Sequence, residues 1–327
     1  MKTNRKLTIA TIVTLFVMLF QGSMFVNAAQ YSSHCVSFDW PDGTYTSTKF
    51  NYDFGNKGQF PSSSELVITG GKLRVTLPAN QESGALVSTS KIPAAASYYV
   101  GGTFSIPSDF SFGNQNDMKL PIGLGGGTCA AGGETDKDNG WSARLMYNGM
   151  SGNFVLYVYD TLRAEWGRIF NTGVACIPGT TYDAEIYILR NTANAFDGAF
   201  TVWINGTQVL DESGIKWSNN QVDCDTLIMD WFRGGGGDPP SVTTYGYIHD
   251  FWWNTANSKP AAPAEVNIAI DKTATASSYD SSTRMPSKAV DGNDATRWSS
   301  TNTDPSWFKV DLGDTYGISH VDRKSVV

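Results

Sequence analysis

The residues of this sequence best suited to chemistry are a lysine, an arginine, a serine and two tyrosines that follow one another closely. They are Lys119, Ser142, Arg144, Tyr157 and Tyr159. Lysine and arginine can hold an anion, and a nearby cation makes a phenol more acidic than usual. The alternative is a solvated cross-strand stack of arginine on tyrosine, which contributes up to about 1 kcal/mol to stability and has no catalytic role.

Period-two geometry predicts that four of these residues share one face of a β-hairpin. Strands are expected on either side of the turn-like segment 148–153. If the hairpin closes symmetrically, Arg144 faces Tyr157 and Ser142 faces Tyr159. The intervening apolar residues then face the core, and the hairpin carries one polar patch.

Lys119 stands in the segment MKLPIGLGGG, where a neighbouring Leu-Pro and a glycine run are more typical of a loop lysine than of a catalyst. The glycine run at 125–127 is not followed by Gly-Lys-Ser/Thr or by a helical pattern. A phosphate-binding loop is therefore excluded.

Composition indicates a folded protein of about two domains. The chain has 327 residues, of which 41% are hydrophobic, 13% aromatic and 17% charged. A disordered chain would be poorer in aromatic residues, and a long coiled coil would be richer in Lys and Glu. The formal net charge is −7 and no basic tract occurs, so nucleic acid is not expected as a partner.

Short runs of strand-forming residues recur through residues 30–253 and predict a domain made of β-strands. Asn205-Gly206 predicts a tight hairpin, because both turn positions tolerate a positive φ. No long helical period is present, so we expect an all-β fold, an antiparallel jelly-roll β-sandwich. The runs are 73–77, 98–106, 141–147, 154–159, 182–189, 200–204 and 245–253.

Residues 1–29 have the features of a secretory signal peptide. Three basic residues precede an apolar stretch at 7–20, and Val26-Asn27-Ala28 offers small residues at the usual cleavage spacing. A membrane anchor is the alternative, but the stretch is short for a span of about 20 residues. We therefore expect a secreted, extracellular protein that has no membrane contact once the signal is removed.

The cysteine count agrees with export. The chain has Cys35, Cys129, Cys176 and Cys224, and an even number in an exported protein favours disulfides, with three complete pairings open. No Cys-x-x-Cys pair or His/Cys cluster occurs, so structural zinc is not expected.

Residues 254–265 predict a linker, since they are rich in Ala and Pro and have no apolar period. Residues 266–327 then begin a second pattern. That stretch is short for a complete β-sandwich of about 100 residues.

Six segments occur in an order that is typical of one enzyme group: KLPIGLGGG, DNGWSAR, LYVYD, NTANAFDGAFTVWINGTQV, DWFRGGGGD and YGYIHDFWW. Together they resemble polysaccharide lyases of family 14 and, less closely, of family 20, over roughly residues 95–255. The resemblance implies a jelly roll with a polar groove on its concave sheet. Here the KLPG-type loop carries an extra Ile122, and a histidine sometimes present after the loop is absent.

The resemblance implies β-elimination in a uronic-acid polymer without a cofactor. The reaction removes the C5 proton and expels the oxygen at C4, so it needs a cation on the carboxylate, a base and an acid. By resemblance, Lys119 has the charge-stabilising or base role, and Arg144 binds the carboxylate with Ser142 orienting it. Tyr157 or Tyr159 acts as base, acid or both.

Further side chains are candidates for substrate binding, and each has a structural role as its alternative. Trp231 could stack on a sugar or pack in the core, and the arginines could line a basic groove or be solvated. His249 lies among aromatic residues in a terminal strand and is expected to be structural. The substrate-binding candidates are Trp231, Arg233 and Arg168, with Arg163 and Arg190 as further groove arginines.

Residues 267–313 resemble the start of a discoidin-like module, carbohydrate-binding module family 32, through NIA, AVDGN, TRW and WFKVDLG. By resemblance, Asp291, Asp294 and Thr296 would hold a structural calcium, whose preferred ligands are oxygens. Solvated turn carboxylates are the alternative. The resemblance stops near Val321, so we expect a truncated, partial β-sandwich.

These observations predict a secreted, monomeric polysaccharide lyase whose partner is an acidic polysaccharide, either poly-mannuronate alginate or glucuronan. Its products would be unsaturated oligosaccharides. One alternative is a lectin or adhesion protein that binds uronate through the same patch without cleaving it. Another is a jelly-roll glycoside hydrolase, which needs two carboxylates, often as Glu-x-Asp-x-x-Glu; that motif does not occur.

Overall fold

The computed structural model describes residues 32–54, 57–59, 66–81, 86–128, 136–163, 166–234, 236–256, 267–293, 295–301 and 305–313. The predicted signal peptide and most of the predicted linker lie outside these residues. Within the described ranges, no helix has the length and apolar character needed to cross a membrane.

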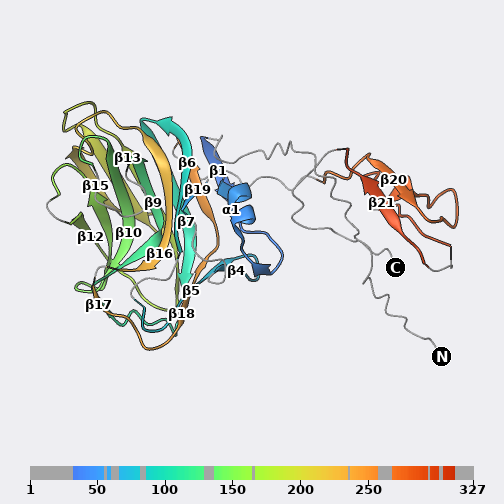
Figure 1. Cartoon of the computed structure of the whole chain (residues 1–327), viewed down its shortest axis with the longest axis horizontal. Helices are drawn as coiled ribbons and strands as arrows, with labels where there is room; N and C mark the ends of the chain where they lie inside the picture. Colours follow the sequence, from blue (N-terminus) through green and yellow to red (C-terminus); the bar gives the residue numbers. More distant parts are fainter. Residues whose placement is uncertain are drawn as a thin grey trace.

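Two antiparallel sheets stack face to face and form a β-sandwich (Figure 1). The first sheet runs, in spatial order, through β15 (Thr207–Ile215), β14 (Gly198–Ile204), β13 (Thr180–Leu189), β7 (Ser97–Ile106), β18 (Thr244–Ile248), β5 (Leu73–Leu77), β4 (Leu66–Ile68) and β2 (Gly43–Thr44), and β19 (Phe251–Asn254) joins β7 and pairs with β1 (Ser33–Val36). The second sheet runs through β12 (Arg168–Ala175), β11 (Asn153–Tyr159), β10 (Gly140–Asn148), β9 (Asp117–Gly127), β16 (Cys224–Arg233), β6 (Leu86–Ala95) and β3 (Lys57–Gln59). The predicted all-β sandwich is confirmed.

Smaller elements complete the described chain. Helix α1 (Ser47–Phe54) lies beside β1 (Figure 1). β8 (Asn114–Gln115) pairs with β17 (Gly237–Asp238). In the C-terminal part, β20 (Thr273–Ala276) pairs with β21 (Phe308–Asp311), and a 3-10 turn η3 spans Pro286–Ala289.

The predicted tight hairpin between β14 and β15 is present. Asn205 and Gly206 have φ values of 51° and 73°, and Ile204 pairs with Thr207. Positive φ at both positions is what a two-residue turn of this hand requires. The local sequence therefore determined this register directly.

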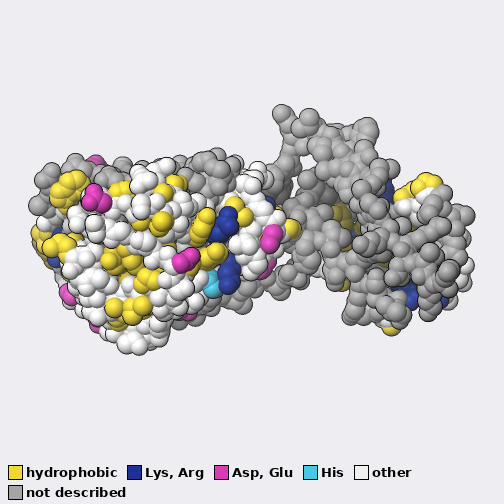
Figure 2. Space-filling view, turned by 90° about the horizontal axis from the view of Figure 1, so that it is seen from below, with side chains coloured by type: hydrophobic (Ala, Val, Ile, Leu, Met, Phe, Trp, Pro, Cys, Tyr) yellow, Lys and Arg dark blue, Asp and Glu magenta, His cyan; other side chains and the backbone are white. Residues whose placement is uncertain are grey.

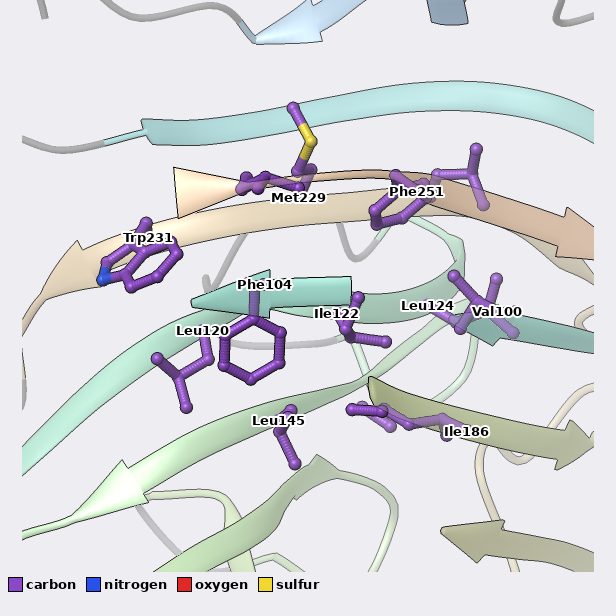
Figure 3. Close-up of a cluster of buried hydrophobic side chains, with 14 of the residues drawn as sticks. Val100, Phe104, Leu120, Ile122, Leu124, Leu145, Ile186, Met229, Trp231 and Phe251 are labelled. Carbon is purple, nitrogen blue, oxygen red and sulfur yellow. The ribbon is translucent and has the colours of Figure 1, made fainter. Parts of the chain in front are cut away.

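The core lies between the two sheets and is filled by residues two apart on each strand. In Figure 3, Val100 and Phe104 of β7 meet Leu120, Ile122 and Leu145 of the opposite sheet. Phe104, Leu120, Ile122 and Leu145 have no exposed surface. This apolar layer fixes which face of each strand points outward.

The expected disulfides are not found at two of the four cysteines. Cys176 and Cys224 are buried free thiols within the core. Burial raises the pKa of both thiols, so they behave as small apolar groups rather than nucleophiles. Cys129 lies outside the described residues.

Candidate active site

The predicted hairpin register is confirmed between β10 and β11. Arg144 pairs with Tyr157 and Ser142 pairs with Tyr159. The intervening Ala143 has no exposed surface and lies in the core. The four polar residues therefore share the outward face of the second sheet, which we call the site face.

Lys119 reaches the site face from β9, so it stands on a strand and not in the predicted loop. It pairs with Met146 of β10 on one side and with Phe232 of β16 on the other. The pairing of β9 with β10 shifts register between Arg144 and Met146. Pro121 lies in this irregular stretch, where a residue without an N–H is tolerated within a sheet.

Gly123 makes room for Arg144. The two residues are register partners, and a Cβ at position 123 would lie 3.3 Å from the Arg144 Cγ and 3.1 Å from the Ile228 Cβ. Such contacts would push the arginine side chain aside. The glycine that follows Lys119-Leu120-Pro121-Ile122 therefore serves the site sterically.

Arg144 is neutralised by a carboxylate that the sequence analysis did not identify. Its Nη1 donates to Asp230 Oδ2 at 3.1 Å, and the two side chains are 2% and 1% exposed. Breaking such a buried pair leaves an uncompensated charge, so the two residues hold each other in place. A buried arginine that is already paired is placed to position the site rather than to reach a polymer.

Alternation along β16 explains why Asp230 is on the site face. Phe232 of the same strand pairs with Lys119, and its ring centroid lies 5.2 Å from the Lys119 Nζ. Trp231 and Arg233 point the other way. The alternation of the segment LIMDWFR is the signal that places Asp230 and Phe232 on one side of the strand.

Lys119 is the cation of this face that carries no ion pair among the described residues. It is half-buried, and burial, followed by the nearby Arg144, lowers the pKa of its ammonium. Asp230 and Asp117 oppose that shift. A desolvated lysine close to a positive guanidinium is suited to holding a substrate anion or to exchanging a proton.

Two phenols lie on the same face, opposite Arg144 and Ser142. The Tyr157 and Tyr159 rings meet edge to face with centroids 5.2 Å apart, and the side chains are 8% and 6% exposed. The backbone N–H of Gly167 donates to the Tyr157 hydroxyl oxygen at 2.9 Å, which holds the phenol in place. The Arg163 guanidinium lies 5.5 Å from the Tyr159 ring centroid.

Ser142 adds a buried hydroxyl to the same face. Its Oγ has no hydrogen-bond partner in the described structure. Buried polar atoms are nearly always paired, so this hydroxyl is available to a group that enters the site.

Two predicted substrate-binding residues are corrected by the structure. Trp231 is fully buried and packs against Phe104 in the core, as Figure 3 shows. Arg233 is also buried, donates to the Pro78 carbonyl oxygen at 2.7 Å and to the Thr244 hydroxyl, and has a pKa lowered by burial to about 10. Neither can contact a polymer, because both side chains point into the sandwich.

The other groove arginines are paired elsewhere. Arg168 forms an ion pair with the buried Asp160 and is the register partner of Val158, so it lies on the opposite side of β12 from the site face. Arg190 pairs with Asp223 at 2.6 Å. The predicted role of Arg168 in substrate binding is therefore not supported.

An exposed aromatic residue borders the site where no candidate was predicted. Trp166 is 69% exposed and adjoins Gly167, which binds the Tyr157 hydroxyl. Ile169, 49% exposed, is the register partner of Tyr157. An exposed indole next to a polar face is suited to stacking on a sugar ring.

In the C-terminal part, oxygens converge on Thr296. Its hydroxyl lies 2.6 Å from Asp291 Oδ1, 2.8 Å from the Asn293 carbonyl oxygen and 3.1 Å from the Lys288 carbonyl oxygen. The hydrogen bond from Thr296 is the largest of the causes that lower the pKa of Asp291. The all-oxygen set fits a hard cation such as calcium; Asp294 lies outside the described residues.

Comparison with known proteins gives the same fold. The chain is similar to the structure of alginate lyase Aly36B, with 27% identity over 69% of this chain and 98% of that one and a TM-score of 0.61. A variant of Aly36B in complex with alginate tetrasaccharide, in which a lysine and a tyrosine are replaced by alanine, is 25% identical to this chain. The PL-14 alginate lyase from Aplysia kurodai is similar at 16% identity over 68% of this chain and all of that one, with a TM-score of 0.54.

The C-terminal segment matches a different family. Residues 288–325 fit the family described as a NedA-like, galactose-binding domain. No curated protein matches the chain. The chain is thus a jelly-roll protein with the fold of the alginate lyases, followed by a segment of the discoidin-like, galactose-binding type.

Proposed function

We propose that this chain is a polysaccharide lyase that cleaves a uronic-acid polymer by β-elimination. The observation that carries the proposal is the juxtaposition of an unpaired, half-buried Lys119 with two phenols and a fixed arginine on one sheet face. The alginate lyase Aly36B shares this fold. Its variant with a lysine and a tyrosine replaced by alanine is found in complex with an alginate tetrasaccharide, which supports the same chemistry here.

The reaction needs three functions at one place. A base takes the proton from C5 of the uronate, the C–H electrons form the C4=C5 double bond, and the C4–O bond breaks as an acid protonates the leaving oxygen. The C5 proton is a poor acid while the neighbouring carboxylate is negative. A cation must therefore hold that carboxylate while enolate charge develops.

The side chains of the site face divide these functions. Lys119 holds the carboxylate and the developing charge, because it is the cation of this face with no protein anion bound to it. Tyr157 and Tyr159 supply the base and the acid, helped by the Gly167 N–H on Tyr157. The Ser142 hydroxyl orients the bound carboxylate, and the Arg144–Asp230 pair keeps the strands and Lys119 in position.

The polymer that we propose is alginate. The relatives with this fold are alginate lyases, and one of their structures holds an alginate tetrasaccharide. Glucuronan is the second polymer of the same chemical class, with a different sugar stereochemistry. The apolar segment near the N-terminus supports secretion, which would bring the protein to an extracellular polysaccharide.

The test is to incubate the purified chain with poly-mannuronate, poly-guluronate and glucuronan. The ultraviolet absorbance of the new C4=C5 double bond is followed with time. We expect a rise on an alginate polymer. Binding without any rise on all three polymers would instead support the lectin alternative.

We also propose that Asp291, Thr296 and the carbonyl oxygens of Lys288 and Asn293 hold a structural calcium in the C-terminal part. The convergence of these oxygens on Thr296 supports this assignment. The Lys288 ammonium, 3.4 Å from Asp291 Oδ2, would have to move aside or share the carboxylate. The ion would stabilise the turn and takes no part in the elimination.

A further inference from the structure

A second polar pocket lies on the first sheet, on the opposite side of the sandwich from the site face. Its volume is about 430 Å³. It opens between the turn joining β4 to β5, the end of β7 and the strand β18. The lining residues are Thr69, Gly70, Lys72, Ser105, Pro107 and Tyr247.

The walls of this pocket are built by outward-facing strand positions. Ser105 and Tyr247 are register partners, and their neighbours Phe104 and Ile248 are fully buried in the core. Alternation therefore turns the Ser105 hydroxyl and the Tyr247 phenol outward together.

Two cations border the pocket and form no ion pair among the described residues. Lys72 lines it, and Arg74 is the register partner of Tyr247. The Arg74 guanidinium lies 5.0 Å from the Tyr245 ring centroid, and its Nε is buried with no hydrogen-bond acceptor. The stacked guanidinium adds positive charge beside the pocket.

The acidic side chains nearby are bound to backbone amides rather than to these cations. Asp42 Oδ1 accepts from the Gly70 N–H at 2.8 Å, and Asp250 Oδ1 accepts from the Thr103 N–H at 3.2 Å. The ion pairs of the described residues include neither Lys72 nor Arg74. The positive charge at the pocket is therefore not cancelled locally by a direct contact.

A histidine extends the polar wall. His249 Nε2 lies 2.9 Å from Ser105 Oγ, and burial, followed by Lys72, lowers the pKa of the imidazole. Figure 2 views the molecule from below and shows a histidine next to basic side chains, with acidic and apolar side chains close by. The histidine that the sequence analysis expected to be structural thus borders a pocket.

We propose that this pocket is a second carbohydrate site that binds the carboxylate of a uronate unit, on the face remote from the site face. Lys72 holds the carboxylate, Arg74 adds positive charge beside it, and the hydroxyls of Ser105, Thr69 and Tyr247 bind the sugar. The aromatic rings of Tyr245 and Tyr247 offer apolar surface to the pyranose. The inference takes only the class of polymer from the proposed function.

A second site changes how the protein meets a long chain. Once one segment of a polymer is bound at the pocket, other segments are presented to the site face at a high effective concentration. A short oligosaccharide cannot span the sandwich, so it gains nothing from the pocket. The pocket should therefore affect the binding of long polymers and leave short oligosaccharides unaffected.

The experiment measures binding in the non-cleaving Lys119→Ala chain, by affinity electrophoresis through gels that contain alginate. Lys72→Ala is added to this background, with Lys72→Arg as the charge-conserving variant. Lys216→Ala is the matched control, because Lys216 follows β15 at the far edge of the same sheet. Carboxyl-reduced alginate replaces alginate in a parallel gel.

We expect Lys72→Ala to weaken retardation by alginate about tenfold, which corresponds to the loss of one charge-assisted hydrogen bond. Lys72→Arg should retain binding, Lys216→Ala should leave it unchanged, and the reduced polymer should not distinguish the variants. With Lys119 intact, turnover of a short uronate oligosaccharide should be unaffected by Lys72→Ala.

Equal retardation of Lys72→Ala and Lys216→Ala would overturn the proposal, as would an undiminished effect of Lys72→Ala on the reduced polymer. This result is independent of the lyase assignment, because binding is read in a chain that does not need to cleave. Loss of binding in Lys72→Ala, together with no cleavage by the chain that keeps Lys119, would support the second site and reject the enzyme.

Discussion

At the scale of single residues, the site depends on which cation stays unpaired. Asp230 neutralises Arg144 by pairing with it in the buried part of the sheet. Lys119 is left with a lowered pKa and no protein anion. The division of labour between a positioning arginine and a reactive lysine follows from this one carboxylate.

Replacing Asp230 tests that division. Asp230→Asn keeps the shape but leaves Arg144 with an uncompensated buried charge, which should lower the free energy of unfolding by about 3 kcal/mol. Urea denaturation measures the loss, and kcat should fall with it. The control is Asp225→Asn, which breaks the exposed pair with Lys91 and should cost less than about 1 kcal/mol. Equal losses in the two variants would contradict the assignment.

Trp166 gives a second test at this scale. If its exposed indole stacks on a sugar unit beside Tyr157, Trp166→Ala should raise KM for alginate several-fold and leave kcat nearly unchanged. Phe196→Ala is the control, because Phe196 is 56% exposed and lies between β13 and β14 of the other sheet. Steady-state rates over a range of alginate concentrations separate the two constants. An unchanged KM in Trp166→Ala would remove it from the binding groove.

At the scale of elements, the alternation of side chains along the strands predicts the main features of the hairpins correctly. The hairpin of β10 and β11 and the turn at Asn205-Gly206 have the expected registers, because a period of two and a tight turn are local properties. Lys119 was expected in a loop, since Pro and Gly usually interrupt strands. The structure tolerates both within β9 through an irregular pairing with β10.

Long-range pairing was harder to predict. Asp230 meets Arg144 only because β16 lies beside β9, and nothing local in the sequence gives that neighbour. The same strand shows the cost of ignoring its period. The sequence leaves Trp231 open between a sugar contact and the core and makes Arg233 a binding candidate, whereas the outward positions of β16 are Asp230 and Phe232.

Helix α1 carries a buried carboxyl whose titration should be visible in stability. Burial raises the pKa of Asp53 to about 7, although Tyr45 and Trp40 donate hydrogen bonds to it. In the unfolded chain the pKa of the same carboxyl is about 4. Between these values the folded chain binds more protons, so this group's contribution to stability is full below about pH 4 and is lost as pH rises through about 7.

The measurement is the urea midpoint of the native chain and of Asp53→Asn from pH 4 to pH 8. The native chain should lose stability relative to the variant as pH rises, because only the native chain must ionise a buried carboxyl. A constant difference between the two chains over this range would mean that Asp53 titrates normally.

At the scale of the whole molecule, the described chain combines a sandwich with a smaller C-terminal part of a different family. The sandwich carries polar faces on both sheets, and the C-terminal part matches a galactose-binding domain. Each of these features suits a carbohydrate. A protein with several weak sugar contacts would remain on a polymer longer than one with a single groove.

Calcium should affect only the C-terminal part. Adding calcium to metal-free protein should raise the midpoint of the thermal transition of this part, and Asp291→Ala should abolish the shift. Differential scanning calorimetry with magnesium as the comparison ion is suitable, because magnesium demands a tighter octahedral shell. An unchanged transition midpoint in the native chain on adding calcium would mean that the oxygens around Thr296 form a turn without a metal ion.

The most direct test of the central claim is the chemistry of the alginate products, read by mass and by ultraviolet absorbance. The native chain and Lys91→Ala, which removes an exposed lysine from the same sheet, should release oligosaccharides that have gained no water and that absorb through a C4=C5 double bond. Lys119→Ala should release almost none. Products that carry an added water, or undiminished release by Lys119→Ala, would contradict a lyase built around Lys119.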